Sequence, residues 1–284
     1  MNALTCQFAI AALLTSITIS ADATADREND ASMNESSLLG PRLRGELLDI
    51  WSQRRLLLIG ETHGTNESPL VVSELFREAA QSSHVVLGLE FPKEDCIYIT
   101  DYLRTTDLPL DITIASKGKF WHRKNQDGRS SSAMLKLIND VKASRDSGMR
   151  VDLECFDSYT LEPGASSDES MARSIKRILA DDRYTDAKFL FLTGNYHGRY
   201  SPESSPPSMA SLLRQSHPFT LLIRSIKPGT SWNCVDQICA AHEFAPKRYL
   251  DVPTPSLLMH GDPDKIGFDG TLLIERFTAS PPLP

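Results

Sequence analysis

Short, continuously apolar runs alternate with amphipathic stretches along most of this 284-residue chain, and this alternation limits the fold more than any other feature. A strand that is apolar at every position, rather than at every second one, is buried on both faces, which is typical of a parallel sheet covered by helices. Strands and helices that alternate at this spacing indicate β-α-β units. We therefore predict an α/β fold with a mainly parallel central sheet and helices on both faces. The predicted strands span residues 54–60, 84–92, 149–157, 187–195, 219–226 and 271–277, and the predicted helices span 69–80, 95–104, 132–147, 168–180 and 207–215.

Composition supports a globular protein and excludes several classes of function. The chain is 40% apolar and 24% charged, which is too apolar for a disordered protein and rules out collagen-like and coiled-coil architectures. Its formal net charge is −7, so it has no basic field able to hold a nucleic-acid backbone. We therefore expect a small-molecule or peptide substrate, and no nucleic acid, as its partner.

The amino-terminal segment is typical of a targeting signal. Residues 8–20 form one apolar run, which is short for a membrane span, and the following Ala21, Asp22 and Ala23 fit a small-x-small cleavage pattern. We predict a signal peptide over 1–23; an uncleaved anchor or an internal helix is the alternative. Residues 24–37 are predicted to be a flexible leader, and 38–284 a single α/β domain with an insertion at about 105–132. The mature protein is then periplasmic or secreted, with no transmembrane segment.

Export would place the remaining cysteines in an oxidising compartment. Cys6 would leave with the signal peptide, and four cysteines would stay. Cys234 and Cys239 lie five positions apart, where a small closed loop is plausible, which leaves Cys96 and Cys155 as a second pair. A zinc site is the alternative, but the chain has no C-x-x-C pair. We predict disulfides.

Polar residues follow several predicted strands at the point where each strand ends. The first strand is followed by GETHGTNE (60–67) and the fourth by GNYHGR (194–199), so both carry a G-x-x-H-G pattern. Glu90 stands at the end of the second strand and Asp157 at the end of the third. Ligands of open α/β sheets bind beyond the carboxyl ends of the strands. We therefore expect these histidines and carboxylates to meet at one rim of the sheet.

Such a set of side chains supports two kinds of hydrolytic chemistry. His63, His197 and Glu90 can hold a divalent metal such as Mn or Zn, which lowers the pKa of a bound water to about 7. Without a metal, a carboxylate–histidine pair can activate water directly, while the second histidine or Arg199 stabilises the oxyanion. The pattern alone leaves both open.

Other polar residues near these motifs are predicted to contact substrate. The long polar stretch at 105–132 is either a lid over the site or an exposed insertion. The chain has no G-x-S-x-G elbow, P-loop or G-x-G-x-x-G motif, so it lacks the signatures of serine hydrolases and nucleotide-binding enzymes. The predicted substrate-contacting residues are Arg199, Tyr196, Asp157, Arg129 and His122.

Four segments, in this order and spacing, carry a family resemblance. LLIGETHGTNESP, LGLEFP, FLTGNYHGR and the closing FDGTLLIERFTASPP resemble the superfamily that unites erythromycin esterases, ChaN-like haem-binding proteins and the Tiki/TraB metalloproteases. The resemblance implies an α/β fold with a pocket at the strand ends. The motif positions that it implies as catalytic are Glu61, His63, Glu90 and His197.

The superfamily contains more than one activity, so the resemblance implies two functions. The first is an exported hydrolase of an ester or amide bond, in which the Glu/His site activates water with or without a metal. The second is a periplasmic haem- or iron-binding protein of the ChaN-like type, with His197, Tyr196 or His63 as axial ligand.

Overall fold

The computed structural model describes residues 37–104, 109, 117–201, 203, 205–246 and 252–282. From Ser37 onward the chain forms one compact unit. The predicted signal peptide and nearly all of the predicted leader lie outside the described residues, as do 105–108 and 110–116 of the predicted insertion. In the part of the chain that is described, no helix is both long and apolar enough to cross a membrane.

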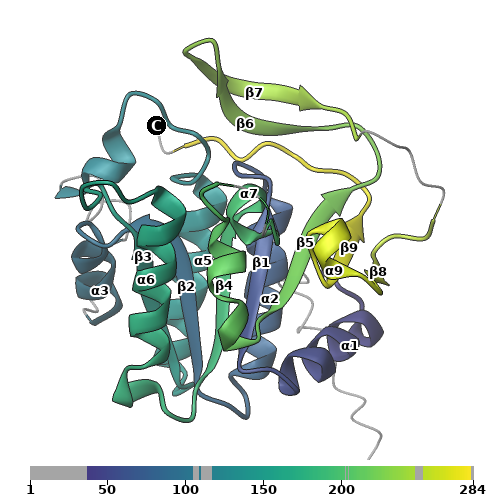
Figure 1. Cartoon of the computed structure of the whole chain (residues 1–284), viewed down its shortest axis with the longest axis horizontal. Coiled ribbons are helices and arrows are strands. Elements are labelled where there is room, and N and C mark those ends of the chain that lie inside the picture. The colour runs from purple at the N-terminus through teal and green to yellow at the C-terminus, as the bar shows by residue number, and fades with distance from the viewer. Residues whose placement is uncertain are drawn as a thin grey trace, which may run out of the picture. The chain divides into compact units, whose positions relative to one another are not determined.

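The central sheet confirms the predicted α/β class. Within the described residues, seven strands lie in the order β3-β2-β4-β1-β5-β9-β8 (Figure 1). Every neighbouring pair is parallel except β8 and β9, which are antiparallel. The strands are β1 (Leu56–Glu61), β2 (Val85–Pro92), β3 (Val151–Asp157), β4 (Lys188–Gly194), β5 (Phe219–Ser225), β8 (Ser256–Met259) and β9 (Gly270–Ile274).

Helices cover both faces of the sheet, as the sequence predicts. The helix predicted over 207–215 is shorter than expected and is divided between α8 and η3. The α-helices are α1 (Pro41–Ser52), α2 (Glu67–Ala79), α3 (Cys96–Arg104), α5 (Ser132–Asp146), α6 (Ser167–Leu179), α7 (Asn195–Gly198), α8 (Met209–Leu212) and α9 (Pro263–Ile266). Short 3-10 helices are η1 (Lys119–His122), η2 (Asp182–Tyr184) and η3 (Arg214–Ser216).

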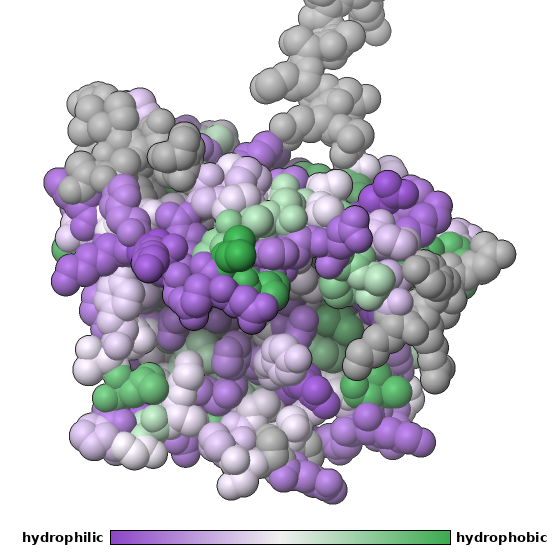
Figure 2. Space-filling model, turned by 90° about the horizontal axis from the view of Figure 1, so that it is seen from above, coloured by the Kyte–Doolittle hydropathy of each residue, from purple (hydrophilic) through white to green (hydrophobic). Residues whose placement is uncertain are grey.

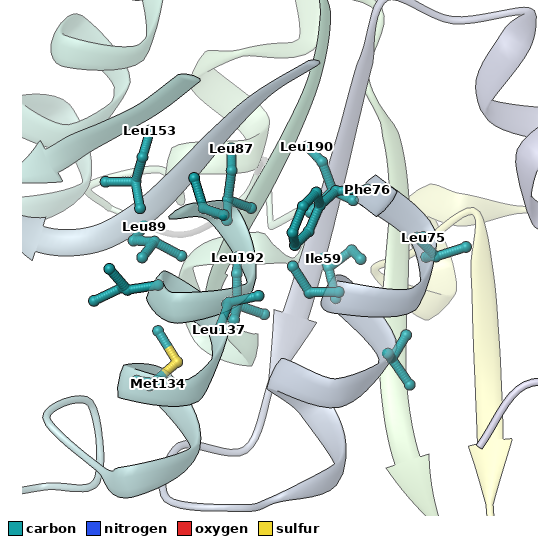
Figure 3. Close-up of a cluster of buried hydrophobic side chains, with 14 of the residues drawn as sticks. Ile59, Leu75, Phe76, Leu87, Leu89, Met134, Leu137, Leu153, Leu190 and Leu192 are labelled. Atoms are coloured by element: carbon teal, nitrogen blue, oxygen red, sulfur yellow. The ribbon is translucent and has the colours of Figure 1, made fainter. Parts of the chain in front are cut away.

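The hydrophobic core lies in two layers, one on each face of the sheet. Successive side chains of a strand point to opposite faces, so Leu57 and Ile59 of β1 join the layer under α2 and α5, while Leu56 and Leu58 join the layer under α6 and α8. Figure 3 shows the first layer, in which leucines of β2 and β4 meet Phe76 of α2. Burial on both faces explains why these strands are apolar at every position.

A two-stranded hairpin, which the sequence analysis does not predict, lies beside the carboxyl end of the sheet (Figure 1). It consists of β6 (Gly229–Val235) and β7 (Ile238–Phe244), paired antiparallel. Asp236 and Gln237 form its two-residue turn with φ values of 49° and 68°, as tight hairpin turns require. The predicted disulfide between Cys234 and Cys239 closes this tip and is confirmed.

The second predicted disulfide is also present. Cys96, the first residue of α3, is bonded to Cys155 in β3. This bond joins positions 59 residues apart and ties α3 to the edge strand of the sheet. The described part of the chain therefore contains both disulfides that the cysteine spacing predicts.

Candidate functional site

The rim at the carboxyl ends of β1, β2 and β4 brings together the two Glu/His motifs. β4 lies between β1 and β2, and all three run in the same direction. Glu61, the last residue of β1, pairs in register with Gly194, the last residue of β4. His63 follows β1, Glu90 lies near the end of β2, and His197 lies in the short helix α7 after β4. The topology thus places these side chains where the sequence predicts them.

His63 is paired with the buried carboxylate of Glu61. Its Nδ1 lies 3.0 Å from Glu61 Oε1, and Glu61 is only 4% exposed. The other ring nitrogen, Nε2, lies 3.7 Å from Glu90 Oε1. A Cβ on Gly194 would lie 2.7 Å from this Nε2, so the glycine makes room for the ring. With Nδ1–H donated to ionised Glu61, Nε2 is left as the basic atom.

Glu90 is fully engaged by hydrogen-bond donors. Its Oε2 accepts from Thr193 Oγ1 at 2.6 Å and from the backbone N–H of Gly194 at 2.7 Å. Its Oε1 accepts from a guanidinium nitrogen of Arg129 at 3.1 Å. Such a set of donors stabilises a buried carboxylate in its charged form.

Arg129 joins three carboxylates into one network. Besides Glu90, it donates to Asp157 at the end of β3 at 2.9 Å and to Asp127 at 3.0 Å. These partners raise the pKa of the guanidinium even though burial lowers it. Arg129 is therefore a fixed positive charge at the rim, beside the two Glu/His motifs.

The second histidine has a carboxylate partner that the sequence analysis missed. Nδ1 of His197 lies 3.0 Å from Asp168 Oδ1, and the same oxygen accepts the backbone N–H of Met209 at 2.6 Å. Asp168 lies in the first turn of α6, where an acidic residue is common for helix stability alone. The signal that could have identified it is its place after β3, since that position also lies at the rim.

Burial and neighbouring charges shift the titration of this cluster in opposite directions. Burial raises the pKa of Glu61 despite its pairing with His63. Burial lowers the pKa of His63, but the carboxylates of Glu90 and Glu61 outweigh it, so the net pKa is raised. His197 also has a raised pKa, because Asp168 and Glu90 outweigh its burial. Glu90 has a lowered pKa, because His63, Arg129 and His197 outweigh its own burial. The two imidazoles and Glu90 therefore act as one electrostatic unit.

A cavity of about 400 Å³ opens on the β5 side of β1. It starts at Thr62, which separates Glu61 from His63 in the sequence, and at Asn195, which follows β4. The described residues that line it are Thr62, Asn195, Arg199, Leu222, Ile223, Arg224, Phe244, Ala245, Pro246, Ile266, Phe268 and Phe277.

The predicted substrate-contacting residues do not all lie together. Arg129 and Asp157 belong to the Glu90 network, while Arg199 lines the cavity on the other side of β1. Tyr196 is 77% exposed, and His122 is an exposed residue at the end of η1. Trp121, in the stretch predicted to be either a lid or an exposed insertion, is buried in the core against Phe91.

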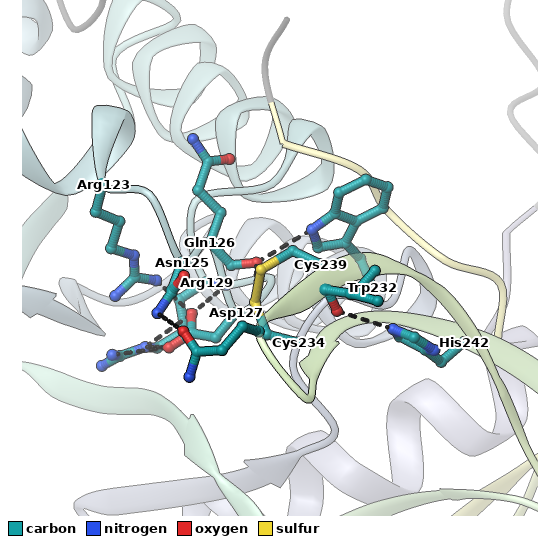
Figure 4. Close-up of a disulfide and its surroundings, with 11 residues drawn as sticks. Arg123, Asn125, Gln126, Asp127, Arg129, Trp232, Cys234, Cys239 and His242 are labelled. Carbon is teal, nitrogen blue, oxygen red and sulfur yellow. Dashed lines mark hydrogen bonds and ion pairs between the residues drawn. A yellow bond between two sulfur atoms is a disulfide. The ribbon is translucent and has the colours of Figure 1, made fainter.

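The hairpin and the loop that carries Arg129 support each other (Figure 4). The backbone carbonyl of Gln126 accepts from Nε1 of Trp232 at 3.1 Å, and the disulfide-bonded sulfur of Cys234 lies 3.4 Å from the same oxygen. Gly64 and Gly128 both have positive φ, and a Cβ on either would lie within 2.6 Å of the Trp232 carbonyl oxygen. Close backbone packing at these glycines therefore holds the hairpin against the rim.

The predicted metal ligands do not converge as a metal site. Among the described residues, no three His, Cys, Asp or Glu side chains are arranged to hold an ion. Both oxygens of Glu90 accept hydrogen bonds, one of them from the cation of Arg129. As placed, these donors do not fit a resident ion. Binding of Mn, Zn or haem stays a prediction.

Comparison with known proteins identifies the fold. No protein-family model and no curated protein matches the sequence. Among solved structures, a histidine-to-asparagine mutant of the erythromycin esterase EreC in its open conformation superposes with a TM-score of 0.63 at 11% identity, covering 85% of this chain and 95% of that one. The chain has the fold of an erythromycin esterase.

Two further solved structures share this fold. A protein from Bacillus cereus gives a TM-score of 0.57 at 9% identity, covering 87% of this chain and 94% of that one. A succinoglycan biosynthesis protein gives 0.55 at 11% identity, covering 84% and 92%. The α/β fold that the four sequence segments implied by their resemblance is therefore confirmed.

Proposed function

We propose that the protein is an exported hydrolase of an ester or amide bond, in which Glu61 and His63 activate water. The observation that carries the proposal is the 3.0 Å contact between His63 Nδ1 and the buried Glu61, which leaves Nε2 as a base at the rim. A base held and oriented by a third group is the arrangement that general-base catalysis requires. The shared fold with an erythromycin esterase supports the same class of reaction.

In the proposed reaction, His63 moves a single proton. Nε2 takes a proton from water as the water oxygen forms a bond to the carbonyl carbon, which gives a tetrahedral oxyanion. The carbon–oxygen or carbon–nitrogen bond of the scissile group then breaks, and the imidazolium returns the proton to the leaving alkoxide or amine. Glu61 stabilises the imidazolium while it exists, because the two groups are in hydrogen-bond contact.

His197 is suited to stabilise the oxyanion. Asp168 holds its Nδ1, and Asp168 and Glu90 raise its pKa above that of a free histidine although burial lowers it, which favours the charged imidazolium. A preorganised positive charge aimed at a developing oxyanion is worth about 10²–10³ in rate. Arg129 is less suited, because Glu90, Asp157 and Asp127 already accept its hydrogen bonds.

The test uses the purified full-length protein with a panel of p-nitrophenyl esters and short peptides. We expect His63→Ala and His197→Ala each to lower kcat/KM by about 10²–10⁴ while circular dichroism and thermal unfolding show a retained fold. The matched control is His84→Ala, which removes another histidine–carboxylate pair, with Asp152, just before β2 begins. Activity unchanged in both rim variants, or lost equally in the control, contradicts the proposal.

A further inference from the structure

The cavity on the β5 side of β1 has a mostly apolar lining. Figure 2, seen from above Figure 1, shows mostly hydrophilic residues, with the hydrophobic ones in small separate groups. Three phenylalanines from β7, from the segment before β9 and from the segment after it line the cavity: Phe244, Phe268 and Phe277. Leu222 and Ile266 add aliphatic surface. A pocket of this size and lining fits the apolar part of a small molecule.

The charges on the cavity wall are all positive. Arg199 and Arg224 line it, and none of its described lining residues is acidic, although the chain carries 37 Asp and Glu against 30 Lys and Arg. Among the described residues, neither guanidinium has a hydrogen-bond or ion-pair partner, whereas Arg129, on the other side of β1, has three carboxylates. Arg224 is half-buried, so its charge is not simply a solvated surface charge. Guanidinium groups with this freedom favour a carboxylate ligand.

The cavity is lined by direct sequence neighbours of the proposed catalytic residues. Thr62, which lies between Glu61 and His63, lines the cavity, and so does Asn195, the residue after Gly194. Phe268 lies against Gly60 at the end of β1, where a Cβ would be 2.8 Å from its ring. The cavity wall therefore includes the residue that separates the two members of the Glu/His pair.

We propose that this cavity binds the apolar part of an anionic substrate, and that Arg199 and Arg224 hold the carboxylate of that substrate. Because it names a substrate, this inference rests on the proposed hydrolysis. Its test measures equilibrium binding and needs no hydrolytic activity. The substrate class is an apolar ester or amide that carries a carboxylate, and polar sugars and cationic peptides are excluded from the cavity by its lining.

The experiment measures binding of sodium octanoate and of its neutral analogue octanamide to the full-length protein by isothermal titration calorimetry. The two probes have the same chain length, so their difference isolates the charge. We expect octanoate to bind at least tenfold more tightly than octanamide, because a charge-assisted hydrogen bond is worth about that factor or more. Equal affinity for both, or no binding of octanoate, overturns the proposal.

Substitutions then assign the effect to the cavity wall. The double variant Arg199→Met with Arg224→Met is expected to remove the preference for octanoate and leave octanamide binding unchanged. The half-exposed Ile266→Asp is expected to weaken octanoate more than octanamide, because it adds a like charge. Arg177→Met, an exposed arginine near the end of α6, is the matched control and should change neither. A preference for octanoate that survives the double variant overturns the proposal.

The two proposals can fail separately. His63→Ala should bind octanoate as the wild type does, because the ring lies outside the cavity lining. Octanoate binding that depends on the arginines, in a protein that hydrolyses no ester or peptide, would support the cavity site and contradict the hydrolase. Ester hydrolysis without arginine-dependent octanoate binding would do the reverse.

Discussion

The two sides of β1 use their arginines in opposite ways. On the β4 side lies the charged cluster, by which we mean Glu61, His63, Glu90, Arg129 and Asp157, where every charge has a close partner. On the β5 side lies the cavity, whose two arginines have no partner among the described residues. Buried charges persist only when they are paired, so the cluster is a fixed electrostatic frame. Unpaired arginines at a cavity wall can bind an anionic ligand without breaking an existing ion pair.

The largest expected effect tests the catalytic half of this comparison. In Glu61→Gln the side chain keeps its shape and still accepts from Nδ1 of His63, but it no longer stabilises the imidazolium. We expect kcat to fall by about 10²–10⁴ with octanoate binding unchanged. Steady-state kinetics and calorimetry on the same preparation measure both.

The control for that prediction is Glu275→Gln, an exposed carboxylate paired with Lys227, which should change neither quantity. Wild-type kcat in Glu61→Gln would mean that the base lies elsewhere. A large loss of octanoate binding would mean that the two sides of β1 are not separate.

Two arginine substitutions, one on each side of β1, test whether the difference in pairing affects the free energy of unfolding. Arg129→Met leaves Glu90 and Asp157 without their shared cation, and removing one partner of a buried ion pair costs about 3–5 kcal/mol in the free energy of unfolding. Arg224→Met breaks no ion pair of the residues that the structure describes, so we expect a change within about 0.5 kcal/mol. Urea denaturation measures both values, and equal losses in the two variants would show that the difference in pairing has no energetic meaning.

The meeting of Glu and His side chains at one rim was predictable because parallel strands end at the same edge of a sheet. Glu61, Glu90 and His197 lie far apart in sequence, but strand order and direction alone bring them to one rim. Asp168 was not predictable in its role, because an acidic residue in the first turn of a helix needs no functional reason. Its contact with His197 depends on how α6 packs, which the local sequence does not encode.

The sequence pattern does not predict the cavity, because part of the cavity wall comes from the hairpin. The segments of β6 and β7 are partly exposed and lack the continuous apolar runs that identify the central strands. Phe244 comes from that hairpin, while Phe268 and Phe277 flank β9, and they meet only once the hairpin is in place. The cysteine spacing at 234 and 239 predicted a small closed loop there, but not the strands that lead into it.

Asp168→Asn tests whether His197 is held by charge or only by shape. Asparagine keeps an oxygen that accepts from His197 Nδ1 and from the Met209 amide, and loses the negative charge. A hydrogen bond to a charged group is worth about 1.5–3 kcal/mol, so we expect kcat to fall about 10- to 100-fold. The pKa of His197, followed by NMR, should fall as well. Asp181→Asn, at an aspartate paired with Arg183 on the surface, is the control. An unchanged pKa with reduced kcat would assign Asp168 a purely steric role.

Among the kinetic effects, Glu90→Gln should produce the smallest change, a displacement of the pH profile. His63 must be neutral to act as a base, and its pKa is raised above 6.5, so in the wild type kcat/KM falls as pH drops through a value above 6.5. Glu90 is the strongest of the neighbouring charges that raise this pKa, and it also raises that of His197. Without its charge, both pKa values fall and the acid limb moves to lower pH.

The raised pKa of His63 should also make the free energy of unfolding depend on pH. A histidine whose pKa is higher in the folded than in the unfolded protein stabilises the fold below pH 6.5 and loses that contribution as the pH rises through the folded value. Glu90→Gln should therefore flatten the pH dependence of the unfolding free energy between pH 6.5 and the alkaline end of the His63 titration, as urea melts at several pH values would show. Glu243→Gln, an exposed carboxylate on the hairpin, should leave both profiles in place. An acid limb at the wild-type pH in Glu90→Gln would mean that the charged cluster does not set the pKa values of the two histidines. The contrast between a fixed electrostatic frame on one side of β1 and a ligand-binding wall on the other would then lose its basis.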